Sequence, residues 1–272
     1  MTALTLALRA APTQRLDLSP LTPAGLAGKS ASDISAIELQ TTRERVTVGD
    51  SFRVRPGDAA TIVFEGGSER FDCVGAALAA GEIMVDGEVG TQAGRLMSGG
   101  RVTIRGDAGP FAGSRMIGGV LEISGAAGDR LAGPLAGETV GMTGGLLHVL
   151  GDAGARAADR LRRGVVLIEG RAGAHAGSRM IAGTLAIGGE AGELPGYLMD
   201  RGTILLGSGA RLLSPSFGDC GEHDLVAAWL IADFVAGASA KLARLFRRRL
   251  RRFAGDLAAL GKGEILLALE AA

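Results

Sequence analysis

Few side chains in this sequence could act as a nucleophile or a general base. The 272 residues include three histidines and two cysteines. Cys220 precedes His223 by three residues in "FGDCGEHD", which makes a cysteine–histidine nucleophile conceivable, but no known family signature surrounds the pair. His148 is expected on the outward face of a strand and His175 in a turn, and the histidine spacings match no metal-binding pattern. We therefore expect no catalytic residue and no metal site in this chain.

Recurring turns in the sequence could also bind small ions or phosphate. Glycine pairs such as "GDAG" resemble phosphate-binding loops, and turn carboxylates such as Asp107 and Asp152 could bind calcium. The pairs recur along the chain without the lysine of a phosphate-binding loop, and the aspartate does not recur at its position. Both features are therefore interpreted as turn geometry, and no cofactor is expected to be bound by this chain.

The remaining side chains with a possible chemical role are arginines, which can bind anions, above all carboxylates. Three of them stand four residues before a recurring glycine, and three belong to the run "RRRLRR" and are expected on one face of a helix. The candidate residues for binding an acidic cofactor or partner are Arg115, Arg160, Arg179, Arg247, Arg248 and Arg251.

Arg160 and Arg179 fall in adjacent repeats, where strand stacking brings them roughly 5 Å apart. Like charges at that spacing repel each other unless an acidic group lies between them. Internal Asp or Glu, the acidic surface of another subunit, and an acidic ligand all remain open as their partners.

A repeat positions these side chains along the middle of the chain. The stretches "GSRMIGGVLEISGAAG" (113–128) and "GSRMIAGTLAIGGEAG" (177–192) agree at eleven of sixteen positions. A leading glycine recurs every 19 residues, with one longer step of 26 around "DRLAGPLAG", where we expect a loop. The leading glycines are Gly81, Gly100, Gly119, Gly145, Gly164, Gly183 and Gly202.

An apolar run that alternates with period two follows each leading glycine, which indicates a half-buried strand. Val102 and Ile104, or Leu121 and Ile123, occupy the inward positions, whereas the residue between them varies. A ladder of Met and Leu before the glycines is interpreted as core. These features predict an all-β solenoid, a right-handed parallel β-helix of about seven 19-residue coils.

The segments on either side of the repeats lack the 19-residue period. Residues 1–75 contain short strand-like runs and are expected to form an N-terminal β cap on the repeat region, 76–215. Residues 216–272 are expected to form C-terminal helices that pack on it. "HDLVAAWLIADFVAG" is apolar nearly all round and should be buried, "ASAKLARLFRRRLRRFAGDLAAL" is amphipathic, and "GEILLALEA" is expected to be a strand.

Composition narrows the possible partners. The 29 Lys and Arg balance the 29 Asp and Glu, so overall charge indicates neither nucleic acid nor an anionic membrane. The longest apolar run is too short to span a bilayer. Two cysteines form no disulfide framework, and a cytoplasmic location is therefore expected.

The pattern G-x-x-M-x-x-G-x-L-x-I-x-G-x-A-G resembles the glycine repeat shared by the C-terminal domain of glutamate synthase and the C-subunit of formylmethanofuran dehydrogenase. With "GDSF" at Gly49–Phe52 before the repeats and a helical end after them, nearly the whole chain is similar to this C-subunit family. The family includes related subunits of bacterial formyltransferase/hydrolase complexes. The Arg-rich, Lys-poor composition favours the bacterial group.

The resemblance implies a non-catalytic scaffold subunit in one-carbon metabolism and formaldehyde oxidation. A formyltransferase subunit would move formyl from formyl-tetrahydromethanopterin to a methanofuran analogue, and a metal-dependent hydrolase subunit would release formate. The analogue's tail of several glutamates would be the acidic ligand for the arginines. The alternatives are the C-subunit of a tungsten or molybdenum formylmethanofuran dehydrogenase, a β-helix acyltransferase, whose six-residue period is missing here, and a stand-alone binding module.

Overall fold

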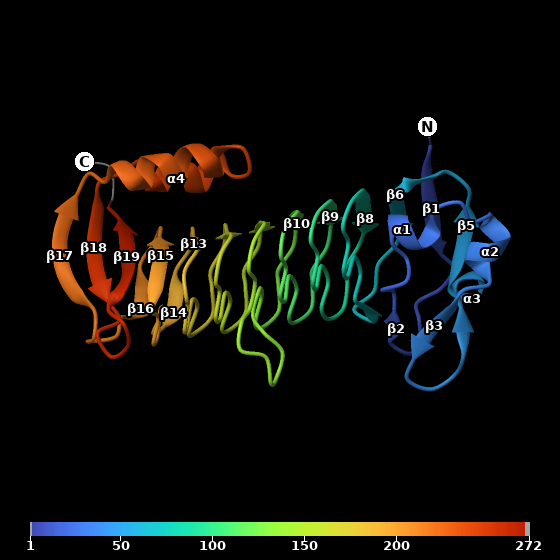
Figure 1. Ribbon diagram of the computed structural model, residues 1–272, viewed down its shortest axis with the longest axis horizontal. Coiled ribbons are helices and arrows are strands. Elements are labelled where there is room, and N and C mark those ends of the chain that lie inside the picture. Colours follow the sequence, from blue (N-terminus) through green and yellow to red (C-terminus); the bar gives the residue numbers. More distant parts are fainter. Residues whose placement is uncertain (1, 270–272) are drawn as a thin grey trace.

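The repeats form a row of parallel strands stacked side by side along a rod (Figure 1). The structure is a computed structural model and describes residues 2–269. Each repeat contributes one short strand to this row, and the seven strands follow one another in chain order. They are β8 (Glu82–Asp86), β9 (Arg101–Ile104), β10 (Val120–Ile123), β11 (Leu146–Val149), β12 (Val165–Ile168), β13 (Thr184–Ile187) and β15 (Arg201–Leu206).

The register within this row is the one that the repeat predicts. Val102 pairs with Leu121, and Leu121 pairs with Leu147 across the longer step. The seven extra residues of that step leave the strand as a loop, so the inward side chains stay aligned and buried. The inward aliphatic residues and the Met and Leu ladder together fill one continuous core.

Glycine recurs in the repeats because successive turns approach closely. A Cβ on Gly106 would lie 2.5 Å from the backbone carbon of Gly87 in the preceding repeat. The other turn segment takes left-handed backbone at alternate residues, for example at His175, Gly177 and Arg179, where φ is 62°, 69° and 54°. Glycine therefore marks only part of this turn, and arginines occupy left-handed positions in four repeats, at Arg115, Arg130, Arg156, Arg160 and Arg179.

The N-terminal segment contains short strands and three helices around an aromatic core. Phe52 lies 5.7 Å from Phe64 and 5.4 Å from Phe71 between ring centroids, and all three side chains are buried. The elements are β1 (Ala3–Leu8), β2 (Leu16–Asp17), α1 (Pro23–Leu26), α2 (Ala31–Ser35), β3 (Glu38–Thr41), β4 (Val46–Thr47), α3 (Val48–Ser51), β5 (Phe52–Arg55), β6 (Asp58–Glu65) and β7 (Phe71–Asp72).

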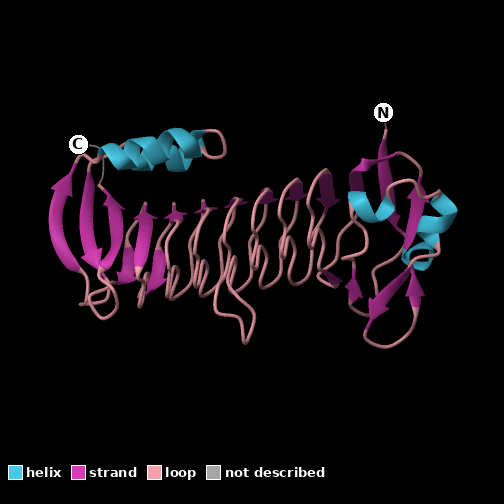
Figure 2. Ribbon diagram, in the orientation of Figure 1, coloured by secondary structure: helices cyan, strands magenta, loops and turns pink. Residues whose placement is uncertain are grey.

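The C-terminal segment returns to the sheet after two helices (Figure 2). The small strands β14 (Ala191–Glu193) and β16 (Ala210–Leu212) pair beside the last repeats. β17 (Gly218–His223), α4 (Val226–Ala236), α5 (Ala240–Phe246), β18 (Leu250–Gly255) and β19 (Lys262–Ala268) follow. β19 adds in parallel to β15, which confirms the strand expected at "GEILLALEA" up to Ala268; the last two residues of that stretch, Glu270 and Ala271, lie outside the described residues.

The fold class predicted from the repeats is wrong. The main sheet has thirteen strands in the order β17-β18-β19-β15-β13-β12-β11-β10-β9-β8-β6-β1-β5 and is mixed, because β1–β5, β17–β18 and β18–β19 pair antiparallel. Residues 2–269 also contain five helices, so the fold is not an all-β parallel β-helix. The 19-residue period shows only the parallel centre of the sheet, whereas the antiparallel strands come from segments without a repeat.

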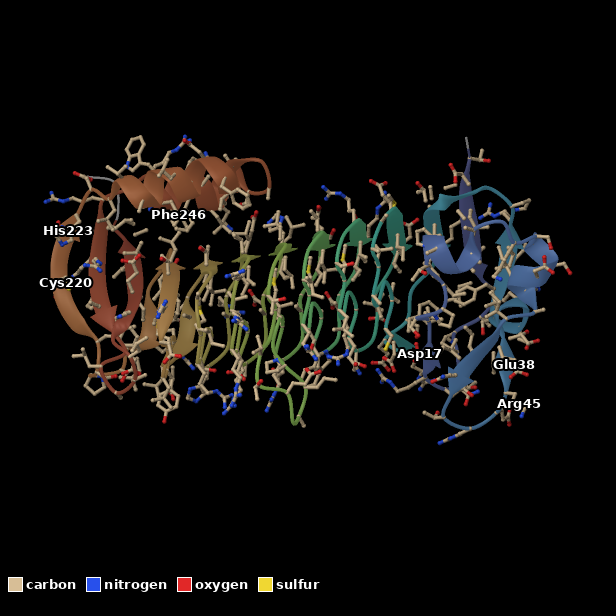
Figure 3. The ribbon with its side chains drawn as sticks, viewed as in Figure 1. Asp17, Glu38, Arg45, Cys220, His223 and Phe246 are labelled. Atoms are coloured by element: carbon tan, nitrogen blue, oxygen red, sulfur yellow. The ribbon has the colours of Figure 1, made fainter. Side chains whose placement is uncertain are left out.

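The long amphipathic helix predicted from Ala238 onward is also wrong, because α5 ends at Phe246 and the following residues form β18. β18 hydrogen-bonds to a strand on each side, and this pairing overrides helix propensity. The two helices cover the outward face of the late strands, where Leu167 and Leu205 are buried: Phe246, labelled in Figure 3, packs in the same cluster. Within residues 2–269, no helix has the length and apolar character needed to cross a membrane.

Candidate functional site in the arginines and around Glu169

Arg179 is bound to a carboxylate inside the protein. Asp159 is fully buried, and it accepts hydrogen bonds from Arg179 Nε at 3.0 Å and Nη2 at 2.6 Å and from Ser178 Oγ at 2.9 Å. The left-handed turn of the next repeat aims this arginine back at the carboxylate. Of the three partners that the sequence left open, an internal aspartate is therefore the one that holds Arg179.

The loop inserted after β10 reaches the other two arginines of this row. Arg160 Nη1 donates to the carbonyl oxygen of Thr139 at 3.2 Å, and Arg115 Nη1 lies 3.6 Å from Glu138 Oε1. Glu138 also accepts from Arg95 Nη2 at 2.7 Å. The Arg95 hydrogen bond is the main cause that lowers the pKa of Glu138 below its ordinary value. These contacts fasten the loop to the repeats on either side.

The second arginine set does not share a helix face. Arg247 and Arg248 follow α5, and Arg251 lies in β18, so the predicted alignment is wrong. Arg247 pairs with Asp233 of α4 at 2.5 Å, and Arg251 pairs with Asp219 of β17 at 2.5 Å. The hydrogen bond from Arg251 is the main cause that lowers the pKa of Asp219. Arg248 is exposed and makes no ion pair within the described range 2–269.

The candidate nucleophiles are not activated by the bases near them in sequence. His223 Nε2 lies 2.9 Å from the backbone oxygen of Cys220, so the imidazole contacts the main chain and not the thiol (Figure 3). His175 packs edge-on against Tyr197, with ring centroids 5.7 Å apart. Burial, more than the neighbouring carboxylates, raises the pKa of Cys73 to about 11, which disfavours its thiolate. Residues 2–269 hold no group of three His, Cys, Asp or Glu placed to bind a metal.

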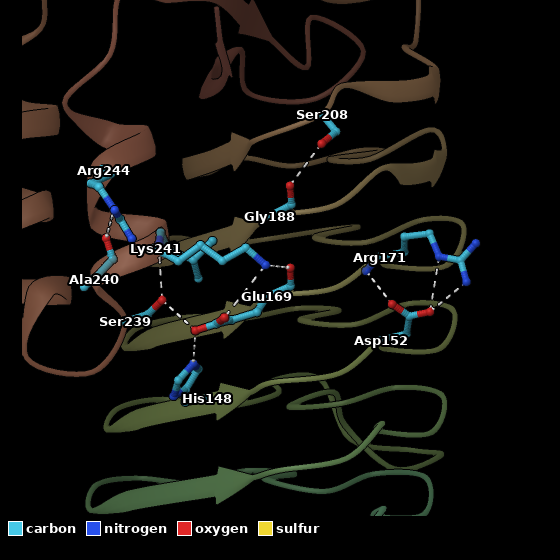
Figure 4. A network of polar contacts seen from close by, with 11 residues as sticks. His148, Asp152, Glu169, Arg171, Gly188, Ser208, Ser239, Ala240, Lys241 and Arg244 are labelled. Atoms are coloured by element: carbon cyan, nitrogen blue, oxygen red, sulfur yellow. Dashed lines mark hydrogen bonds and ion pairs between the residues drawn. The ribbon is translucent and has the colours of Figure 1, made fainter. Parts of the chain in front are cut away.

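Glu169 organises a polar cluster that the sequence did not indicate (Figure 4). It follows β12 and meets the outward face of the sheet, where His148 Nε2 lies 3.1 Å from its Oε1. Ser239 Oγ donates to the same oxygen at 2.7 Å, and Lys241 Nζ donates to the Glu169 carbonyl oxygen at 2.9 Å. Ser239 also caps α5 through Leu242 N, so the cluster fixes the α4–α5 hairpin to the sheet.

Comparison with known proteins assigns the family. No protein-family model matches the chain. A chain in the X-ray crystal structure of the formyltransferase/hydrolase complex (FhcABCD) from Methylorubrum extorquens, in complex with methylofuran, has a TM-score of 0.93 and 43% identity, covering 98% of this chain and 100% of that one. The curated C-subunit of the Fhc formyltransferase/hydrolase complex of the same species is 43% identical over 86 residues. This chain belongs to the C-subunit family of formyltransferase/hydrolase complexes.

The sequence match to the curated C-subunit spans about a third of each protein, 32% of both, whereas the structural match spans nearly all of this chain. The resemblance drawn from the glycine repeat is therefore confirmed. For the six arginines no comparison bears on ligand binding, and their role as contacts of a cofactor tail or an acidic partner stays a prediction. Neither Glu169 nor Ser239 could be found from the repeat, because the residues at the position of Glu169 in other repeats include Ser124 and Gly188.

Proposed function

We propose that this chain is a non-catalytic scaffold subunit of a formyltransferase/hydrolase complex. The observation that carries the proposal is the end-to-end likeness, at 43% identity, to a chain of the FhcABCD complex. The burial of His148 also supports it, because its side chain is only 7% exposed. A general base needs access to a reacting proton, which a buried ring does not have.

In this proposal the sister subunits perform the chemistry. A formyltransferase subunit moves formyl from formyl-tetrahydromethanopterin to a methanofuran analogue, and a metal-dependent hydrolase subunit releases formate. This chain contributes a rigid spacer, because seven strands stacked at about 4.8 Å extend over roughly 30 Å. Two free cysteines are consistent with a reducing compartment, so we place the complex in the cytoplasm.

The arginines divide into engaged and available groups under this proposal. Arg179, Arg247 and Arg251 are neutralised by internal carboxylates. Arg160 and Arg248 make no ion pair among residues 2–269, so we propose that these two contact acidic surfaces of sister subunits. A glutamate-rich cofactor tail is the alternative ligand, and replacing Arg160 by Gln separates the two. Tail binding predicts a raised KM for the long-tailed cofactor with assembly intact, whereas docking to a sister subunit predicts weaker assembly.

Affinity purification of the tagged chain from its native cells tests the proposal. We expect a formyltransferase and a metal-dependent hydrolase to co-elute and to be identified by mass spectrometry. Recovery of the chain alone, or with tungsten- or molybdenum-containing subunits, would contradict it. A triple variant, His148→Gln, His175→Gln and Cys220→Ser, should keep the turnover of the assembled complex. Lost turnover with assembly intact would place a catalytic residue in this chain.

A further inference from the structure

The helix α4 presents its large apolar side chains to solvent. Val226, Trp229, Leu230 and Phe234 are 77%, 52%, 67% and 65% exposed. Positions 226, 230 and 234 are four residues apart and therefore share one face of the helix. Position 229 lies at the edge of that face. We call these four residues the α4 stripe. Figure 1 shows α4 lying along the outside of the strands at the C-terminal end of the rod, and the exposed fractions show that residues 2–269 leave the stripe uncovered.

The side of α4 that faces the sheet carries the smaller residues. Ala228, Ala232 and Val235 are the buried residues of this helix, packed over the late strands. A helix whose only apolar contact is its own sheet places its large aliphatic and aromatic residues inward and its polar residues outward. The reverse arrangement here corrects the expectation that this segment is buried within the chain. It also indicates that the outward face has an apolar partner of its own.

The helical hairpin that carries the stripe is basic. Asp233 lies on α4 beside Phe234 and pairs with Arg247, which places the end of α5 next to the stripe. Residues 225–249 contain five Lys or Arg and Asp233 as their one carboxylate. Arg244 and Arg248 are exposed and have no carboxylate at ion-pair distance among residues 2–269. A second copy packed on this stripe by two-fold symmetry would bring the same cations face to face.

We infer that the α4 stripe is the docking surface for a sister subunit of different sequence. The fitting partner is an apolar groove with an Asp- or Glu-rich border, which takes the helix in the manner of other helix-in-groove interfaces. Trp229 and Phe234 are the anchors, because aromatic side chains buried at the centre of an interface dominate its affinity. Arg244 and Arg248 supply the charge complementarity that selects this partner over another copy of the chain. The inference rests on the proposed function and locates one of the interfaces that it requires.

Reconstitution of the full chain with the co-expressed sister subunits tests this inference. Leu230→Asp is compared with Leu257→Asp, since Leu257 lies in the β18–β19 loop and is equally exposed, at 69%. We expect Leu230→Asp to weaken co-purification at least about tenfold, as loss of a central interface residue does, while Leu257→Asp assembles as the wild type does. Circular dichroism of the isolated variants reports their folding, and both changes lie on exposed positions.

Footprinting provides a second readout that needs no variant. Hydroxyl-radical labelling of Trp229 and Phe234, read by mass spectrometry, should fall on assembly of the wild-type chain. Unchanged labelling in an assembled complex would overturn the inference, as would equal effects of the two aspartate variants or a homodimer of the isolated chain that Leu230→Asp dissociates. Failure of the wild-type chain to assemble would instead refute the proposed function.

Discussion

Replacing Arg179 by Met should destabilise the chain far more than replacing an exposed arginine would. Asp159 is fully buried, and its two hydrogen bonds from the guanidinium are its only contacts with a positive charge among residues 2–269. The variant leaves that carboxylate buried with one hydroxyl donor, Ser178. Removing one partner of a buried ion pair costs about 3–5 kcal/mol. Because the Arg179 side chain is 34% exposed, we expect the lower end, about 3 kcal/mol.

The matched control is Arg171→Met. Arg171 also donates to an aspartate, Asp152, through Nε and Nη2, but the two side chains are 73% and 47% exposed. An exposed pair contributes at most about 1 kcal/mol. For a chain of this size each kcal/mol shifts Tm by about 2–4 °C, so thermal unfolding followed by circular dichroism should separate the variants by at least about 4 °C.

A third variant tests whether the buried charge is the cause. Adding Asp159→Asn to Arg179→Met removes the uncompensated charge and should recover part of the lost stability. The reasoning is refuted if Arg179→Met and Arg171→Met unfold at the same temperature. It is equally refuted if the double variant is less stable than Arg179→Met alone.

Three further predictions follow from individual contacts. The pKa of Glu138 is lowered in the folded chain, so its stabilisation is present above its ordinary pKa of about 4.3 and is lost as pH falls through the lowered value. The protection of residues 133–141 against hydrogen exchange, relative to the intrinsic exchange rate at each pH, should therefore fall in acid, and Arg95→Gln should lower it at neutral pH. At pH 8, iodoacetamide should modify the exposed Cys220 and spare Cys73, whose pKa is about 11, as peptide mass spectrometry can check. Ile123→Asp buries a charge in the core at a cost of several kcal/mol, and an unchanged urea midpoint would contradict its inward position.

The sequence predicts the central strands because repetition imposes the same neighbours on every repeat. The alternation that places Leu121 inward recurs with each leading glycine, so one strand fixes the register of all seven. The segments before and after the repeats have no such repetition to fix their pairing. The run after α5 has helix-favouring residues and an apolar face. Leu250 and its neighbours nevertheless form a strand, because they pair with β17, which precedes the two helices, and with β19. Such long-range pairing cannot be inferred from local pattern.

The arginines, too, could be predicted only in part from the sequence, because local pattern gives their positions and packing determines their partners. Their recurrence four residues before glycine is visible in the sequence, but their partners are not, because Asp159 lies one repeat earlier and Glu138 lies in an inserted loop. The exposed face of α4 is predicted wrongly as buried, since apolar composition alone does not distinguish a contact within the chain from a contact between chains.

The longer step after β10 has a consequence for how a rod of this kind can change length. Seven additional residues bulge sideways there, while Val120 still pairs with Leu146 and the alignment of the stack is kept. Only the gain or loss of a whole repeat would move the two ends of the rod apart or together, in steps of about 4.8 Å. Relatives that hold their sister subunits at different separations should therefore differ by multiples of one repeat, whereas their turns are free to vary in length.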